Sequence, residues 1–199
     1  MTLEQNVAEA HFKAGRLMEA QAAFWALVRA NPRQPKAWER LGDIALKLGQ
    51  PGQAYDFYGN AYDFNPDAPG VRLGLGRALC KMGRLQEATA HLKKARAHLE
   101  LAEILEKLER DEEAVLAYRN HLAQDEHDAD AMLRLASVLV RLKNYEEADE
   151  LLHLATLLQS ENPAPLFMQG DIKQRSHELA AAENYYRQAL RVDPTYAPA

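Results

Sequence analysis

The acidic stretch Asp125–Asp130 contains the side chains in this sequence that are best suited to holding a metal ion. Carboxylate oxygens are the ligands that hard cations such as Ca²⁺ prefer. A calcium-binding loop also needs a glycine in its middle and a glutamate at its end, and this stretch has neither. We therefore interpret it as a solvated connection between two structural elements.

Other residue types that carry out chemistry are scattered along the chain. Seven histidines form no His-Glu-x-x-His pattern, and only His121 and His127 lie close together. The segment Gly74-Leu75-Gly76 lacks the further glycine and the lysine of a phosphate-binding loop, and no Gly-x-Ser-x-Gly motif occurs. The sequence therefore predicts no catalytic residue, no metal and no cofactor, and a protein that is not an enzyme.

The charge of the chain argues against nucleic acid as a partner. The formal net charge is −5, with 11 Lys and Arg against 8 Asp and Glu in residues 1–85 and 13 against 21 in residues 86–199. Nucleic-acid binding rests mainly on clustered Lys and Arg, and the sequence has no basic stripe. No run approaches the ~20 apolar residues of a membrane span, and the single cysteine, Cys80, leaves no internal disulfide. We expect a soluble, cytoplasmic protein that binds no membrane.

A repeat of 34 residues organises the chain. Gly15, Gly49 and Gly83 are 34 residues apart, and an alanine follows each of them five residues later. A large apolar residue comes four positions after each alanine. The second repeat shows the fullest pattern: Trp38, Leu41, Gly42 and Ala45, followed by Ala54, Tyr58, Ala61 and Pro66.

This pattern resembles the tetratricopeptide repeat family, which has Trp, two residues, Leu-Gly, two residues, Tyr, then Ala, three residues, Phe, and then Pro. The chain departs from the family pattern at the Tyr position, where it has Ala45. The resemblance implies an all-α fold, a right-handed superhelical α-solenoid of about six helix-turn-helix hairpins in a single array over residues 1–199. The expected units are 1–34, 35–68, 69–94, 95–128, 129–162 and 163–196.

The spacing of apolar residues predicts two amphipathic helices in each unit. Leu41 and Ala45 share one face of the first helix, and Ala54 and Tyr58 share one face of the second. We expect Gly42 to pack against Ala54 where the two helices cross, and a proline to end each second helix. Neighbouring units would then complete the burial of each other's apolar faces.

The third unit is irregular, because it has 26 residues where the others have 34. One interpretation is a continuous helix over about 86–108, which contains neither Gly nor Pro. The other is that a flexible loop of about eight residues is missing from this sequence, since 97–102 has the pattern of a new helix start. The sequence leaves both interpretations open at the joint near 94–98.

The resemblance implies a concave groove, lined by the first helix of each unit, that holds a peptide or protein partner. The last turn of each first helix carries a basic residue, which also suits the helix dipole. Apolar and positively charged side chains at the centre of the groove favour an acidic or amphipathic partner. The expected groove residues are Glu9, Phe12, Lys13, Asp43, Lys47, Leu73, Arg77, Lys81, Glu103, Lys107, Leu133, Arg134, Arg141 and Phe167.

Two further residues are candidates for an interface. Trp25 follows the core residue Phe24, and we expect it to point to the surface. Leu190 lies in a last unit that no polar capping helix follows, which favours either a longer protein or association through the terminal repeats. We expect a protein-binding adaptor; the alternatives are a recruiting or regulatory domain of a larger enzyme and a self-assembling scaffold.

Overall fold

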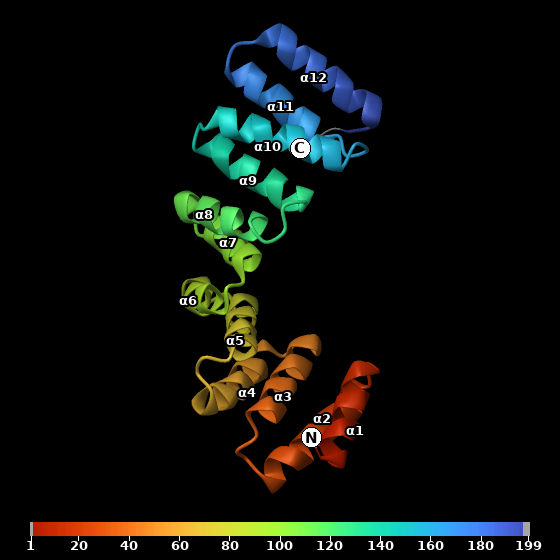
Figure 1. Cartoon of the computed structure of the whole chain (residues 1–199), viewed down its shortest axis with the longest axis vertical. Coiled ribbons are helices and arrows are strands. Elements are labelled where there is room, and N and C mark those ends of the chain that lie inside the picture. The colour runs from red at the N-terminus through yellow and green to blue at the C-terminus, as the bar shows by residue number, and fades with distance from the viewer. Residues whose placement is uncertain (1, 197–199) are drawn as a thin grey trace. The chain divides into compact units, whose positions relative to one another are not determined.

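The computed structural model describes residues 2–196, and these residues form twelve α-helices and no strand (Figure 1). The helix pairs α1 and α2, α3 and α4, α5 and α6, α9 and α10, and α11 and α12 pack as hairpins, so the predicted all-α helical repeat solenoid is confirmed. Their bounds are α1 Leu3–Lys13, α2 Leu17–Ala30, α3 Pro35–Lys47, α4 Pro51–Phe64, α5 Pro69–Lys81, α6 Leu85–Ala95, α7 His98–Lys107, α8 Asp111–Leu122, α9 Ala129–Arg141, α10 Tyr145–Leu158, α11 Ala164–Arg175 and α12 Leu179–Val192.

Contacts divide the chain into two compact units, Met1–Ile104 and Leu105–Ala199, with the division inside α7. In the first unit each helix from α1 to α6 packs on the next, and the first helices α3 and α5 also touch. The second unit repeats this order from α8 to α12, with α9 touching α11. Each hairpin therefore buries its apolar face against a neighbouring hairpin, as expected for stacked repeats.

The turn inside each hairpin has the same left-handed geometry. The residue after the left-handed position donates its amide to the carbonyl five residues earlier, for example Gln50 to Ala45 at 2.9 Å and Asn144 to Leu139 at 2.8 Å. This is the bonding of a Schellman motif, which ends a helix at a residue with positive φ. That residue is Gly15, Gly49 and Gly83 in the first three hairpins, and Glu109, Lys143 and His177 in the last three.

The irregular joint contains a helix break, so the continuous helix proposed over 86–108 is wrong. Arg96 has φ 56° and lies in the left-handed region, and the amide of Ala97 donates to Leu92 at 3.1 Å. This geometry ends α6 at Ala95, and α7 begins at His98. The interpretation that a loop of about eight residues is missing here stays a prediction.

The shortening at this joint is distributed over three elements. The helix α6 has 11 residues where α4 has 14, and α7 has 10 where α3 has 13. Two residues connect α6 to α7, whereas 65–68 connect α4 to α5. Three residues from each helix and two from the connection thus account for the eight residues by which this repeat is short.

Small residues in the core allow large ones to pack between helices. The alanine that follows each hairpin turn is at most 3% exposed in all six hairpins. A Cβ atom built on Gly42 would lie 2.8 Å from the ring of Tyr58. The nearest neighbour of Gly42 is therefore this ring and not Ala54, which the sequence predicted. Gly74 of the next hairpin lies against the same ring. The buried alanines are Ala20, Ala54, Ala88, Ala114, Ala148 and Ala182.

Candidate functional site

The first helices of the first unit carry a network of charged side chains around Arg40. Its Nε lies 2.7 Å from Glu9 on α1, and its Nη1 lies 2.8 Å from Oδ2 of Asp43 on α3. The other oxygen of Asp43 accepts a 2.6 Å hydrogen bond from the hydroxyl of Tyr58 on α4. Burial opposes the charge of Arg40, but the two carboxylates outweigh it and raise the pKa of Arg40. The network therefore links charged groups of two first helices to the hydroxyl of a second helix.

An aromatic ring lies beside this network. The ring centre of Phe12 is 5.0 Å from Cζ of Arg40 and 4.7 Å from Nζ of Lys47, both within the range of a cation–π contact. A pocket of about 270 Å³ opens next to Glu9, where Gln5 donates a 3.1 Å hydrogen bond to Gln34. The structure thus brings together four of the predicted groove residues in this unit: Glu9, Phe12, Asp43 and Lys47.

Every first helix ends at a basic residue, as the sequence predicts. In the first unit these residues are Lys13, Lys47 and Lys81, which we call the lysine edge. All three are exposed, and none forms an ion pair with a described residue. In the remaining first helices the final residues are Lys107, Arg141 and Arg175.

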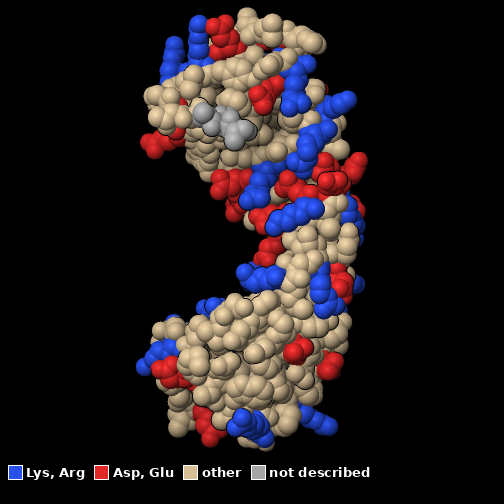
Figure 2. Space-filling view, turned by 180° about the vertical axis from the view of Figure 1, so that it is seen from behind, with Lys and Arg blue, Asp and Glu red and all other residues tan. Residues whose placement is uncertain are grey.

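Two arginines that were predicted to make the groove positive are neutralised. Arg77 makes a bidentate contact with Glu100, at 3.0 Å from Nε and 2.5 Å from Nη2. Arg141 pairs with Asp111 at 2.8 Å and Glu106 at 3.2 Å. The bond from Arg141 lowers the pKa of Asp111. Figure 2 shows the same pattern over the second unit, where acidic side chains lie beside basic ones.

The other predicted groove residues lie in different surroundings. Leu73 and Glu103 are half-buried in the first unit, and Leu133 is half-buried in the second. Phe167 packs on Tyr186, with ring centres 5.1 Å apart. Lys107 and Arg134 are exposed on the second unit. A single groove that joins the residues of both units stays a prediction.

Trp25 is partly buried, so the expectation that it is exposed at the surface is wrong, while its role at an interface stays a prediction. Its ring makes edge contacts with Trp38 and Phe57, at centre distances of 5.7 and 5.5 Å. The next hairpin covers this face of α2, because consecutive hairpins stack. Leu190, the other interface candidate, is 47% exposed.

The acidic stretch contains a compact group of possible metal ligands. Side-chain atoms of His121, Asp125 and Asp128 lie within 4.8 Å of one another. Asp128 already uses both oxygens: one caps α9 at the amide of Ala131 (2.9 Å), and the other lies 2.7 Å from Nε2 of His121. These contacts lower the pKa of Asp128. The geometry agrees with a structural connection at the start of α9.

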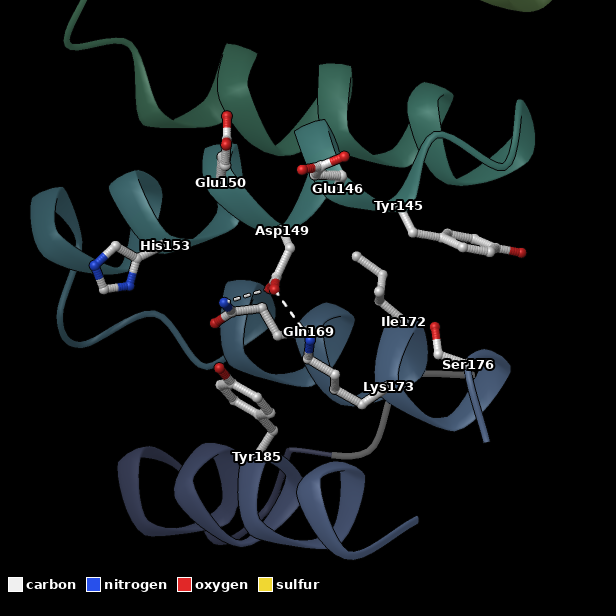
Figure 3. A pocket seen from close by; sticks show the side chains of 10 residues that line it. All are labelled: Tyr145, Glu146, Asp149, Glu150, His153, Gln169, Ile172, Lys173, Ser176 and Tyr185. Carbon is white, nitrogen blue, oxygen red and sulfur yellow. Dashed lines mark hydrogen bonds and ion pairs between the residues drawn. The ribbon is translucent and has the colours of Figure 1, made fainter. Parts of the chain in front are cut away.

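A pocket between the fifth and sixth hairpins, lined mostly by residues with polar groups, was not anticipated from the sequence. It has a volume of about 480 Å³ and lies among α10, α11 and α12 (Figure 3). Asp149 accepts a 2.8 Å hydrogen bond from Nε2 of Gln169 and lies 3.3 Å from Nζ of Lys173. Comparison of the repeats could have identified this pocket, because Gln169 occupies the position that is Leu41, Leu75, Leu101 and Leu135 in earlier repeats. We call this pocket the notch.

The helices of the described residues are all too short or too polar to cross a lipid bilayer.

Two proteins with known sequences are similar to parts or most of this chain. A TPR repeat-containing protein of Pseudomonas aeruginosa is 32% identical in an alignment that covers 94% of this chain and 34% of that protein. The Superkiller complex protein 3 of Mus musculus is 32% identical over 80 residues, which are 40% of this chain and 5% of that protein. The chain thus spans about a third or less of the length of these relatives.

Solved structures share the fold. YrrB, described as a TPR protein with an unusual peptide-binding site, superposes with a TM-score of 0.80 at 17% identity, over 87% of this chain and 94% of YrrB. PilF of Pseudomonas aeruginosa superposes with a TM-score of 0.73 at 17% identity, over 97% and 91% of the two chains.

Family models of the tetratricopeptide repeat match residues 8–69, 45–99, 97–132, 130–156 and 164–196. These matches together cover most of the chain, and helix pairs such as α3 and α4, or α9 and α10, pack into the hairpins that such repeats form. The chain belongs to the tetratricopeptide repeat family.

Proposed function

We propose that this chain is a protein-binding module that holds an acidic segment of a partner against the first helices of its first unit. Tetratricopeptide repeats suggest an interaction module, because a rigid stack of helices offers a shaped surface for a partner. The lysine edge carries the more specific part of the proposal. Its three exposed cations have no acidic partner among the described residues, and they recur at the same position of successive hairpins.

The surroundings of the lysine edge favour a segment that is both acidic and apolar. Phe12 offers an aromatic surface between Arg40 and Lys47. The pocket beside Glu9 is lined by Phe24 and Leu27, which suits an apolar side chain. Carboxylates of the partner would then meet the lysines, and an apolar residue would occupy the pocket.

The proposed action is binding without catalysis, in keeping with the usual role of this family. Cys80 is the single cysteine of the chain and leaves no internal disulfide, which suits a reducing compartment, and we propose a cytoplasmic location on that basis. The similarity to about a third of a longer Pseudomonas protein supports the alternative that the module recruits partners for a larger protein. Self-association through Leu190 stays a prediction, and concentration-dependent light scattering would reveal it.

The experiment that tests this function compares two variants with equal changes of charge. The first is Lys13→Glu, Lys47→Glu, Lys81→Glu, which reverses the lysine edge. The control is Arg33→Glu, Lys93→Glu, Lys94→Glu, which changes exposed basic residues, two of them in the last turn of α6. The control therefore reproduces much of the lost interaction with the helix dipole.

Each protein is used to capture partners from a native lysate, after circular dichroism has shown equal helicity. We expect a partner held by the native chain and by the control to be lost from the lysine-edge variant. Equal capture by all three proteins would contradict the assignment of this face.

A further inference from the structure

The notch is built from side chains of three helices in the second unit. Glu146, Asp149 and Glu150 project from α10, and Asp149 points to Gln169 and Lys173 on α11 (Figure 3). Tyr185 on α12 lines the same pocket. Its volume of about 480 Å³ lies in the range of small-ligand sites.

Polar residues have replaced core residues in this hairpin. Gln169 occupies a position that is leucine in the four preceding repeats, and Lys173 occupies one that is Leu79, Leu105 and Leu139 in the three preceding repeats. Those leucines are buried, and they complete the contact between successive hairpins. A polar group at such a position loses packing and must be solvated or bonded. The replacement opens the core of the sixth hairpin and gives it a polar floor.

Gln169 is the buried component of the notch. Its side chain is held by the bond from Nε2 to Asp149, and the residue is only 3% exposed. Among the described residues, no donor bonds its amide oxygen. The amide oxygen itself is not fully buried, so a ligand or water can supply a donor to it. The notch therefore presents an acceptor that is ready for a donor group.

The carboxylates around the notch exceed its cation. Lys173 is paired with Asp149 at 3.3 Å and approaches Glu178 at 3.9 Å. Glu146 and Glu150 make no ion pair or hydrogen bond with any residue that the structure describes. One turn apart on α10, they leave two negative charges for a ligand to neutralise.

We propose that the notch binds the guanidinium group of an arginine side chain of a partner protein. A guanidinium is planar, carries five N–H donors and can bond carboxylate and amide oxygens together. It can also stack on an aromatic ring, which Tyr185 supplies. The notch shares no residue with the lysine edge, so either site can fail its test without the other.

The test is a titration of the ¹⁵N-labelled full chain with a short blocked peptide, acetyl-Gly-Arg-Gly-amide, observed by NMR. Two further peptides carry citrulline or lysine in place of arginine. Citrulline keeps the shape of the side chain but has no charge. We expect shift changes concentrated at 146–153, 169–173 and 185 with the arginine peptide, and weaker binding of the other two.

The variant Glu146→Gln, Glu150→Gln removes both free charges from exposed positions and leaves the bonds of Asp149 intact. We expect it to weaken binding of the arginine peptide about tenfold, as charge-assisted hydrogen bonds become neutral ones. The control Glu19→Gln, Glu112→Gln makes the same change of charge on α2 and α8. An absence of shifts at the notch, equal binding of the citrulline or lysine peptide, or an equal loss in the control would overturn the proposal.

Discussion

The hydroxyl of Tyr58 donates a 2.6 Å hydrogen bond to Asp43, so a core residue of a second helix fixes a charged residue on a first helix. The ring of Tyr58 is 1% exposed, and its position is set by the packing of two hairpins. Asp43 in turn holds Arg40, which contacts Glu9 on the preceding hairpin. The arrangement recurs in the sixth hairpin, where Tyr186 bonds Asp171 at 2.8 Å. The core thereby determines the geometry of the surface that we propose for binding.

Tyr58→Phe should destabilise the chain by about 1–2 kcal/mol, because it removes a hydrogen bond to a carboxylate and leaves the ring packing intact. Urea unfolding followed by circular dichroism would measure the change. Tyr62→Phe on the same helix is the control, since no described residue bonds the Tyr62 hydroxyl. Equal stability of the two variants would show that the bond to Asp43 contributes nothing.

Gly74→Ala should destabilise the chain by about 1–3 kcal/mol through overpacking. A Cβ atom at this position would lie 2.3 Å from the Tyr58 ring, which other core residues hold in place. Gly59→Ala, where a Cβ atom meets nothing within 4 Å, should instead stabilise α4 by about 1 kcal/mol.

A second substitution tests whether the tyrosine ring is the cause. Leu92 and Leu152 occupy the position of Tyr58 in other hairpins, so Tyr58→Leu should make room for alanine at position 74. We expect the double variant to lose less stability than the sum of its single changes, as double-mutant analysis would show. Strict additivity would place the strain elsewhere.

Lys143→Gly should stabilise the second unit by about 0.5–1 kcal/mol. Lys143 has φ 61° in the turn between α9 and α10, where Gly15, Gly49 and Gly83 serve in the first three hairpins. Glycine relieves the steric cost of this conformation, although it makes the unfolded chain more flexible. Lys143→Ala keeps the strain and should give no such gain; if both variants gain equally, loss of the lysine charge is responsible.

These turns show how far the sequence predicts the fold. Glycines at 34-residue spacing identify the first three hairpins, because glycine is the residue favoured at positive φ. Glu109, Lys143 and His177 adopt the same conformation, but their residue types carry no such signal. Their hairpins are recognisable from the alanines that follow the turns and from the large residues four positions later, Tyr118, Leu152 and Tyr186.

The surface was less predictable than the core. Trp25 was expected in solvent because the period of α2 alone does not say which face the next hairpin covers, and that depends on how hairpins stack. Arg77 was expected to be a free positive charge because Glu100 lies 23 residues away in the sequence. The notch depends on residues that differ from those at the equivalent positions of other repeats. Gln169 is recognisable as unusual only by comparison with the buried leucines of those repeats.

The free energy of unfolding should decrease as the pH is lowered, because His91 ionises. Burial, aided by the positive charge of Arg72, lowers the pKa of His91 below its ordinary value of 6.5. The unfolded chain therefore takes up a proton that the folded chain excludes, and the free energy of unfolding decreases as the pH falls below about 6.5. His91→Phe should show a smaller decrease between about pH 7.5 and about pH 5.5 in urea unfolding. An unchanged pH profile would contradict the prediction.

Restoring the core residues of the preceding hairpins to the notch should stabilise the second unit at the expense of its polar floor. The variant Asp149→Val, Gln169→Leu, Lys173→Leu introduces the residues found at the equivalent positions 115, 135 and 139, all of which are buried. Replacement of a partly buried ion pair by apolar residues of suitable size should raise the free energy of unfolding by about 1–3 kcal/mol. Lys173→Leu alone should lower it, because Asp149 then loses its cation. Thermal unfolding of both variants would show whether the polar residues of the notch lower or raise the stability of the fold. A triple variant less stable than the native chain would show that these polar residues stabilise it.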